Sequence, residues 1–357
     1  MRGCNITCRS CYNADTRWIK STKQVREELD LLIRLRRLES VGIIGGEPTL
    51  HPQLLEIVRV LKSRGLWVEL CTNGVALDNT YVQALKIAGI DLVVMHIEKG
   101  QKRPDLPSKP DVESVAELQE RKAALIARHG IKVGLAVTIH PDSLDEMSSA
   151  IRVTLRSRDV DFLLLTLHRS DSAVGPLRGD FTSGFYGDPS PPAVANPLKN
   201  ANMYKLLRDD FGLVPYAYLC SNVDKHEPRW LTYMAVTCAN GDRTYTHGLR
   251  ASLFEPLYGR ISRVVYGRYP FGKFPKPAII RAQLLFNGFF GGSLFMNLKF
   301  LSRSRRTGNV LKVKRIAFQH AATKTADGRL IHCRNCPDAV LKNGRLVPVC
   351  VTDFVDA

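Results

Sequence analysis

The chain is organised around residues 2–12, which read RGCNITCRSCY. This stretch places Cys4, Cys8 and Cys11 in the pattern Cys-x3-Cys-x2-Cys, on a polar segment without helical or strand periodicity. A loop of this length can curl around one inorganic centre. Three thiolates suit a cluster of four irons and four sulfides, in which each sulfur binds one iron and the fourth iron stays open. Zinc is the alternative, but zinc motifs are usually paired with a second knuckle, and none lies nearby.

Two later segments belong with the cysteine loop. They are Gly45-Gly46-Glu47-Pro48 and Cys71-Thr72-Asn73-Gly74. In this order and at these distances, the three segments resemble the radical S-adenosylmethionine (SAM) superfamily, and the resemblance covers roughly residues 1–168. It implies that the three cysteines bind a [4Fe-4S] cluster whose open iron holds SAM. It also implies that SAM is cleaved reductively to a radical that abstracts hydrogen from a substrate, with an electron donor such as flavodoxin or ferredoxin.

The resemblance also implies which residues bind SAM: Gly45, Gly46, Glu47, Pro48, Thr72, Asn73, Gly74 and His96. The glycine backbone would face the methionine part of SAM, and Glu47 would help hold its amino group. A lone Gly-Gly is also typical of a tight strand-to-helix turn, and a histidine at a strand end is more often structural. The family usually has an aromatic residue before its third cysteine, where this chain has Ser10, with Tyr12 as the candidate replacement.

Strand and helix patterns alternate five times in the first half of the chain. The expected strands are 41–44, 67–70, 91–97, 131–139 and 162–167, and the expected helices are 23–38, 54–61, 81–88, 112–128 and 144–155. This alternation predicts an α/β fold with a parallel sheet, whose ligands sit at the carboxyl ends of the strands. The resemblance makes it a partial (β/α)6 TIM-like barrel of radical SAM type. A first strand would normally precede the cysteine loop, so we expect the core to lack it.

Two further histidines, His140 and His168, end the last two expected strands. They would face the same rim as His96 and could contact substrate or transfer protons. They could equally be coincidental.

The composition changes after residue 168. Residues 169–200 are rich in Gly, Ser, Pro and Asp, which predicts a linker or lid loop. Residues 201–310 form a basic, apolar-rich extension, with helical patterns at 202–210 and 228–238. Residues 311–357 are the expected auxiliary metal-cluster region.

Residues 258–306 have a basic–apolar–basic layout around the apolar run 278–298. This layout suits an interfacial segment on a membrane. A core helix pair broken at the glycines explains it equally simply. RNA binding through aromatic stacking and arginines is a third and weaker interpretation, because no RNA-binding motif is present.

The net charge of +17 comes from 51 Lys and Arg against 34 Asp and Glu. Such a surplus favours anionic partners, although it also simply promotes solubility. The sequence has nine cysteines and no recognisable signal peptide, which predicts a reducing, cytoplasmic compartment. Contact with the membrane surface is compatible with this location.

A second cysteine group lies near the end of the chain. Cys333 and Cys336 form Cys-x2-Cys, and Cys350 follows an Asn343-Gly344 hairpin signal that would bring it back beside them. The region resembles the auxiliary-cluster region of the GTP-cyclising radical SAM enzyme, and more loosely the SPASM and twitch extensions. It implies a second iron–sulfur cluster, with zinc as the alternative. Candidates for a fourth ligand are Cys220, Cys238, His320 and His332, or the substrate.

Together these features predict a radical SAM enzyme with an unidentified small-molecule, lipid or peptide substrate. The alternative function is a non-catalytic iron–sulfur or zinc protein that binds nucleic acid or an anionic membrane, with nucleic acid the weaker partner.

Overall fold

The computed structural model describes residues 3–9, 11, 19–168, 200–240, 243–266, 277–291, 293–306, 310–325 and 328–352. The expected linker or lid, except for Asn200, lies outside the described residues. So do Ser10 and Tyr12.

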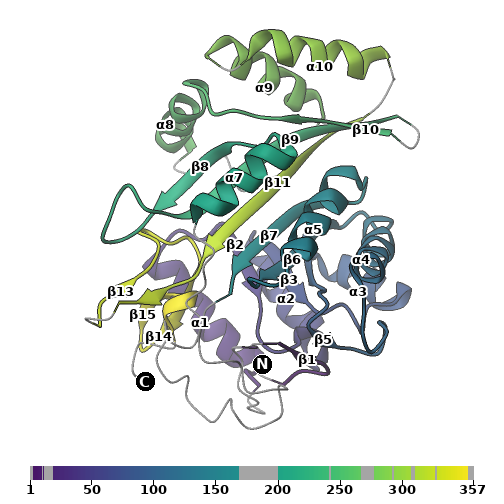
Figure 1. Cartoon of the computed structure of the whole chain (residues 1–357). Helices are drawn as coiled ribbons and strands as arrows, with labels where there is room; N and C mark the ends of the chain where they lie inside the picture. Colours follow the sequence, from purple (N-terminus) through teal and green to yellow (C-terminus); the bar gives the residue numbers. More distant parts are fainter. Residues whose placement is uncertain are drawn as a thin grey trace.

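The first half of the chain forms a parallel sheet covered by helices, as predicted (Figure 1). The parallel strands are β2 (Ser40–Ile43), β3 (Trp67–Thr72), β4 (Leu92–His96), β6 (Lys132–Ile139) and β7 (Val160–Leu167). The helices are α1 (Thr22–Leu35), α2 (Leu54–Ser63), α3 (Asn79–Ala88), α4 (Val112–Ala127) and α5 (Leu144–Arg156). One large cluster of buried aliphatic side chains joins the two layers, and its burial supplies the main driving force for folding.

Local sequence signals set the helix boundaries. Ser21 and Gln24 form a capping box at the start of α1, and Asp78 and Asp111 cap α3 and α4 through their side chains. Gly89 ends α3 with φ +105°, a left-handed conformation that glycine adopts readily.

The sixth parallel strand is β11 (Leu311–His320), which pairs with β7. Strand β9 (Pro228–Asn240) lies antiparallel to β11, and β8 (Pro215–Cys220) and β10 (Arg243–Gly248) pair with β9. The strand order is therefore β10-β9-β11-β7-β6-β4-β3-β2. Five of these parallel strands were predicted from the sequence, and the sixth, β11, comes from the C-terminal part of the chain.

The helix predicted at 228–238 is wrong, because these residues form β9. Leu231, Tyr233 and Ala235 pack into the main core, whereas Val236 and Cys238 pack into a second cluster beside α9 (Pro277–Phe289). A strand buried on both faces carries apolar residues at mixed spacing, which imitates a helical pattern. The helix predicted at 202–210 is confirmed as α7 (Asn200–Phe211).

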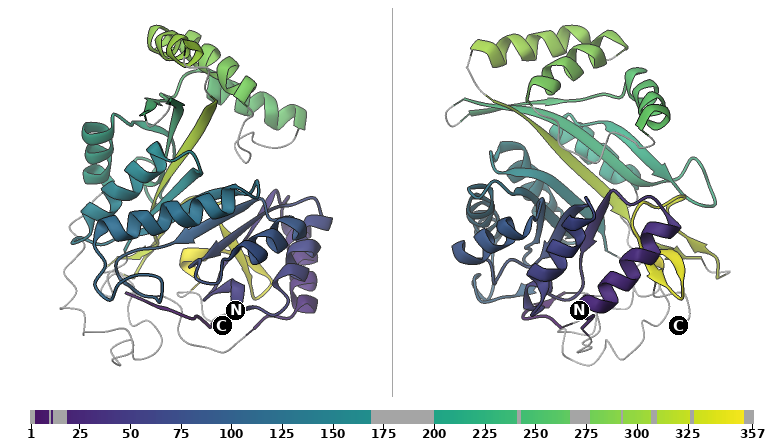
Figure 2. Two further views of the ribbon diagram at one scale, coloured as in Figure 1. Left: turned by 90° about the vertical axis from the view of Figure 1, so that its right-hand side faces the viewer. Right: turned by 180° about the vertical axis from the view of Figure 1, so that it is seen from behind.

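Three helices lie together over the β9–β10 end of the sheet: α8 (Phe254–Tyr266), α9 and α10 (Leu294–Arg306) (Figure 2). The chain turns between α9 and α10 near Gly291, whose φ is +107°. The predicted break at the glycines is confirmed, but the prediction of a core pair is wrong, because most apolar side chains of the two helices are exposed. Only a few of the apolar side chains of this pair are buried, including Ile280, Leu284 and Phe300. No helix in the described part of the chain is both long and apolar enough to cross a membrane.

The C-terminal segment is built from short antiparallel pairs: β12 (Thr323–Lys324) with β13 (Leu330–Ile331), and β14 (Ala339–Lys342) with β15 (Arg345–Pro348). Asn343 and Gly344 connect β14 to β15 with φ values of +50° and +71°. The predicted hairpin is therefore confirmed, in the left-handed conformation that an Asn-Gly turn favours.

Candidate functional site

The cysteine loop lies at the carboxyl edge of the parallel sheet. The short strand β1 (Thr7–Cys8) pairs with β5 (Gln101–Lys102), which follows β4. The backbone N–H of Arg9 donates to Gly100 O at 2.8 Å, and the N–H of Glu47 donates to Gly3 O at 2.7 Å. Three backbone attachments therefore fix the loop against the segments that follow β2 and β4.

Glu47 ties the turn after β2 to the turn after β3. It is fully buried, and its Oε1 accepts hydrogen bonds from Thr49 N (2.9 Å), Thr49 Oγ1 (2.6 Å) and Thr72 Oγ1 (2.7 Å). Its Oε2 accepts from Asn73 N at 2.7 Å. Four donors use most of the acceptor capacity of a carboxylate. Glu47 therefore positions the two turns, and the expectation that it also holds the amino group of SAM stays a prediction.

Asn73 continues this network to the cysteine loop. Its Nδ2 donates to Asn5 Oδ1 at 2.7 Å and lies 3.7 Å from Cys4 Sγ. Gly74 follows with φ +75°, and a β-carbon there would lie 3.6 Å from Met95 Sδ. The turn thus needs glycine for its backbone conformation rather than for space. The Gly-Gly-Glu-Pro segment, the Thr-Asn-Gly turn and the cysteine loop form one connected unit.

The sequence patterns did not reveal the arginine that supports this unit. The Arg103 side chain is fully buried and donates to Asn73 O at 2.9 Å and Gln101 Oε1 at 2.8 Å. Asp105 neutralises it through contacts of 2.6 and 3.0 Å. The only sequence feature that could have indicated this role is the spacing Arg103-x-Asp105 shortly after a strand. Such pairs are common on protein surfaces, so the spacing alone does not identify a buried arginine. Only the fold shows that it reaches the Thr-Asn-Gly turn.

His96 lies at the end of β4, as predicted, and contacts Cys8 and Glu98. Its Nε2 is 2.9 Å from Glu98 Oε2, and its ring also hydrogen-bonds with Cys8. Burial would lower the pKa of His96, but the Glu98 carboxylate and Cys8 raise it well above its usual value. Glu98 is itself buried and accepts from Thr138 N at 3.0 Å. His96 therefore forms part of the wall beside the cysteine loop.

The other two histidines of the rim also come together. His140 and His168 stack with ring centroids 4.4 Å apart at the ends of β6 and β7. His140 is buried, its Nε2 has no hydrogen-bond partner, and burial lowers its pKa. Burial therefore favours the neutral form of the His140 imidazole, and its Nε2 is a buried polar atom without a hydrogen-bond partner.

The three N-terminal cysteines suit the donor set of an iron–sulfur cluster. None of the nine cysteines, all of which lie in the described ranges, forms a disulfide, and Cys4, Cys8 and Cys11 are each at least partly accessible. They lie on a loop held by backbone bonds, with the amide of Asn73 beside one sulfur. Hydrogen bonds to cluster sulfurs and burial of the loop are the usual means by which a protein adjusts such a group.

The C-terminal cysteines are also brought together. Cys333 is buried and hydrogen-bonds with Cys336, whose thiol donates to Asp338 O at 3.4 Å. The hydrogen bond with Cys336 lowers the pKa of Cys333. Cys350 is close enough to raise this pKa electrostatically, but by less, so the net shift is downward. Within the described ranges, no three His, Cys, Asp or Glu side chains stand as a ready site for a single metal ion.

The structure separates the four candidates for a further ligand of this group. Cys220 O accepts from Arg334 N at 2.8 Å, and His332 O accepts from Asn222 N at 2.9 Å, so both residues adjoin Cys333. His320 ends β11 on the same side of the fold. Cys238 pairs with Leu311 at the opposite end of β11 and packs among apolar side chains, so its candidacy is wrong.

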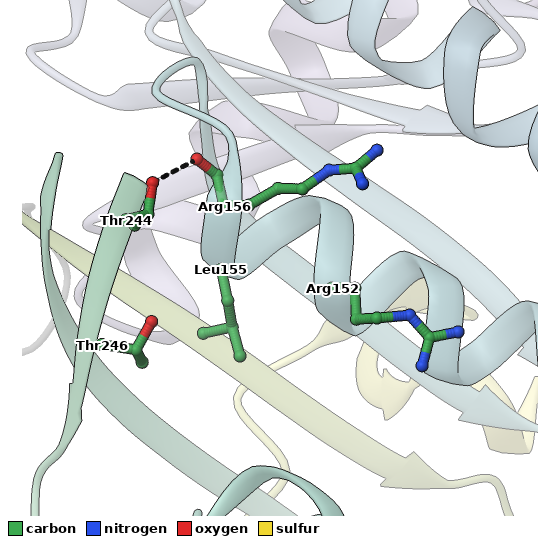
Figure 3. Close-up of a pocket in the computed structure, with 5 residues that line it drawn as sticks. All are labelled: Arg152, Leu155, Arg156, Thr244 and Thr246. Atoms are coloured by element: carbon green, nitrogen blue, oxygen red, sulfur yellow. Dashed lines mark hydrogen bonds between the residues drawn. The ribbon is translucent and has the colours of Figure 1, made fainter. Parts of the chain in front are cut away.

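An open pocket of about 200 Å³ lies at the other end of the sheet, between α5 and β10. Its lining residues are Arg152, Leu155, Arg156, Thr244 and Thr246. Figure 3 shows both guanidinium groups turned away from the threonine hydroxyls. Arg156 is paired with Glu120 at 2.9 Å, and Thr244 donates to Arg156 O. The two arginines do not converge on a common point, so this pocket does not form an anion site.

The comparison with protein families agrees with this geometry. Residues 1–153 match the model of the Radical SAM superfamily. These residues form a radical SAM domain. A match to this superfamily implies a [4Fe-4S] cluster and SAM as the cofactors of residues 1–153.

Relatives with curated names match only a part of the chain. An AdoMet-dependent heme synthase of Methanosarcina barkeri is 32% identical over 101 residues, which is 27% of this chain and 28% of that protein. A PqqA peptide cyclase of Ruegeria pomeroyi is 27% identical over 141 residues, 38% of this chain and 37% of that protein. The chain thus spans well under half the length of either relative.

Solved structures also resemble the chain. The crystal structure of Streptococcus suis SuiB bound to precursor peptide SuiA has a TM-score of 0.37 and 17% identity, over 46% of this chain and 37% of that one.

Proposed function

We propose that the whole chain is a radical SAM enzyme that uses two iron–sulfur clusters. Cys4, Cys8 and Cys11 would hold the first cluster, with SAM at the carboxyl edge of the sheet. The observation that supports this best is the connected unit of Glu47 and Asn73, which joins the cysteine loop to the turns after β2 and β3. Such a network fixes ligand positions before any cofactor binds.

The chemistry comes from the cofactors, and the chain supplies placement. When bound, the cluster delivers the electron that cleaves SAM to a radical able to abstract hydrogen from a carbon atom. Glu47 and Arg103 fix the turn that faces the cofactors, and Gly45 and Gly46 let a ligand approach the backbone closely. His96, held by Glu98, lines the adjoining wall.

The second cluster would be bound by Cys333, Cys336 and Cys350. This region packs toward the sheet: Arg36 Nη1 donates to Pro337 O at 3.2 Å, and Asp338 influences the pKa of both Glu69 and Cys71 on β3. Arg229 is buried and fastens the region through bonds to Ala321 O, Thr323 Oγ1 and Ile331 O. The segment is therefore integrated with the core rather than an independent tail.

The substrate would lie between this region and the carboxyl edge of the sheet. Peptide substrates are favoured among the candidate classes because one relative is named as a peptide cyclase. A small polar molecule is the second candidate, because the ionisable side chains of Glu69 on β3, Arg315 on β11 and Asp338 are close enough for Glu69 to interact electrostatically with the other two. The His140–His168 pair would contact the substrate. The basic surface suits an acidic electron donor such as flavodoxin or ferredoxin.

Anaerobic reconstitution followed by incubation with SAM and a strong reductant tests the proposal. Formation of 5′-deoxyadenosine and about eight iron atoms per chain are expected, because each four-iron cluster contributes about four. Replacing all three C-terminal cysteines by alanine should lower the iron content to about four without abolishing SAM cleavage. A fully loaded protein that never forms 5′-deoxyadenosine would instead favour the non-catalytic binder.

A further inference from the structure

The helix layer α8–α10 exposes an unusual number of large apolar side chains. The exposed fraction reaches 86% for Val264, 74% for Phe289 and 76% for Phe295. The other exposed apolar residues of this layer are Leu253, Leu257, Tyr258, Ile261, Val265, Ile279, Leu285, Phe286, Leu294, Met296 and Leu298. Single exposed apolar residues are ordinary. A cluster of them on three neighbouring helices indicates an interaction surface for a protein or a membrane.

The same segment is strongly basic. Residues 250–306 contain eleven Lys and Arg against one acidic residue, Glu255. The basic residues are Arg250, Arg260, Arg263, Arg268, Lys273, Lys276, Arg281, Lys299, Arg303, Arg305 and Arg306. The exposed basic residues include Arg260 on α8, Arg281 on α9, and Lys299, Arg303 and Arg305 on α10. Apolar and cationic side chains therefore share one helix layer.

We propose that the α8–α10 layer docks the protein on an anionic lipid surface. Its apolar side chains would enter the boundary between headgroups and acyl chains, and its Lys and Arg would contact the lipid phosphates. A second copy of this chain fits the surface less well, because pairing two α8–α10 layers would bring two positively charged surfaces into contact. A nucleic acid is also poorer, because most of the exposed apolar residues are aliphatic and offer no stacking surface.

The position of the layer decides what docking would do. Figures 1 and 2 place α9 and α10 at the opposite end of the molecule from β1 and the cysteine loop. A protein docked through α8–α10 would hold its cofactor site away from the lipid. The surface thus serves to attach the enzyme, and a lipid substrate entering through residues 258–306 is not supported.

Co-sedimentation with vesicles tests this proposal without SAM or an intact cluster, so its failure is distinguishable from failure of the proposed enzyme. The full chain is mixed with vesicles of phosphatidylcholine and phosphatidylglycerol at 7:3, and with vesicles of phosphatidylcholine alone. Binding to the anionic vesicles, weakening as salt rises, is expected. Absence of binding at physiological salt would overturn the proposal, as would equal binding to both vesicle types.

Two triple variants separate the contributions of charge and apolar contact. Reversing the charge of Arg260, Arg281 and Lys299 to Glu should weaken binding at least about 100-fold, since each basic residue near the surface contributes about 1 kcal/mol. Val264→Ser, Phe289→Ser and Phe295→Ser together should weaken it by a similar factor through lost apolar insertion.

Matched variants elsewhere control for net charge and for folding. The charge control combines Lys23→Glu, Arg121→Glu and Lys225→Glu, and the apolar control combines Ile87→Ser, Tyr218→Ser and Val223→Ser, all at exposed positions. Both controls should bind like the parent. If a control loses binding as strongly as its partner variant, or if sedimentation without vesicles shows a dimer that only the surface variants abolish, the lipid assignment is wrong.

Discussion

Asn73 Nδ2 donates to Asn5 Oδ1 across 2.7 Å, linking the turn after β3 to the cysteine loop 68 residues earlier in the sequence. The same amide lies 3.7 Å from Cys4 Sγ. If Cys4 binds the cluster as proposed, Asn73 would act as a supporting residue that orients this ligand without binding the metal itself.

Asn73→Ala should therefore impair the cluster more than the fold. We expect a 10–100-fold loss in iron retention or 5′-deoxyadenosine formation, the range seen when a ligand's supporting residue is removed. Iron and sulfide analysis after anaerobic reconstitution measures the first effect. The matched control is Asn79→Ala on α3, whose side chain bonds to His129 on the surface. Equal effects of the two variants would remove the special role of Asn73.

Glu47→Gln should destabilise the folded protein by about 2–3 kcal/mol. The amide nitrogen of glutamine would replace one of two buried oxygens that receive hydrogen bonds from Thr49, Thr72 and Asn73. A donor would then face a donor. Urea unfolding of the apo-protein measures the change. Glu56→Gln, at a solvent-exposed ion pair on α2, should cost no more than about 0.5 kcal/mol.

The sequence specified the parallel half of the sheet well because its signals are local. The helices α1, α3 and α4 begin at side-chain caps, and α2 and α5 carry stripes of buried apolar residues. Two of the motifs, Gly45–Pro48 and Thr72–Gly74, were correctly placed at the ends of β2 and β3, and such ends lie side by side in a parallel sheet.

Long-range pairings could not be predicted in the same way. Strand β11 joins β7 across more than 140 residues, and nothing in 311–320 indicates that partner. Strand β9 was mistaken for a helix because it is buried on both faces. Arg103 and Arg229 look like ordinary surface residues until the fold buries them.

Glu146 predicts a pH-dependent stability. Burial, with Glu98 nearby, raises its pKa to about 7 although Lys99 N–H donates to it. A carboxyl with a raised pKa is neutral in the folded protein at low pH, and its ionisation destabilises the fold as pH rises from 4.5 through 7. Glu146→Gln should match the parent near pH 4.5 and be roughly 3 kcal/mol more stable at pH 8. Urea unfolding at both pH values measures the difference.

The surface variant Glu117→Gln on α4 serves as the control for Glu146→Gln and should show no such trend. A stability difference between Glu146→Gln and the parent that does not change with pH would show that ionisation of Glu146 is not the cause.

Lys314 predicts the opposite trend at high pH. Its ammonium is fully buried on β11 and donates to Ser157 O at 2.6 Å and to Val160 O. Burial lowers its pKa to about 8 from 10.5. The unfolded chain then binds more protons than the folded one between these values, so the parent gains stability as pH rises from 8 to 10.5.

Relative to Lys314→Met, the parent should gain roughly 3 kcal/mol between pH 7 and pH 10.5. Thermal or urea unfolding of both proteins measures this shift, and thiol titration cancels in the comparison. Lys312→Met, at a partly exposed position on the same strand, is the control. A constant difference between parent and Lys314→Met across this range would mean that Lys314 is not destabilised by burial.

The most direct test is the cluster content and SAM cleavage of Cys8→Ala, prepared without oxygen beside the parent and Cys238→Ala. Cys8 is expected to be an iron ligand, whereas Cys238 is buried in an apolar cluster far from the loop. We predict that Cys8→Ala forms no SAM-cleaving cluster and yields no 5′-deoxyadenosine, while Cys238→Ala retains both. A Cys8→Ala protein that assembles the N-terminal cluster and cleaves SAM at the parental rate would contradict a radical SAM site built on this loop.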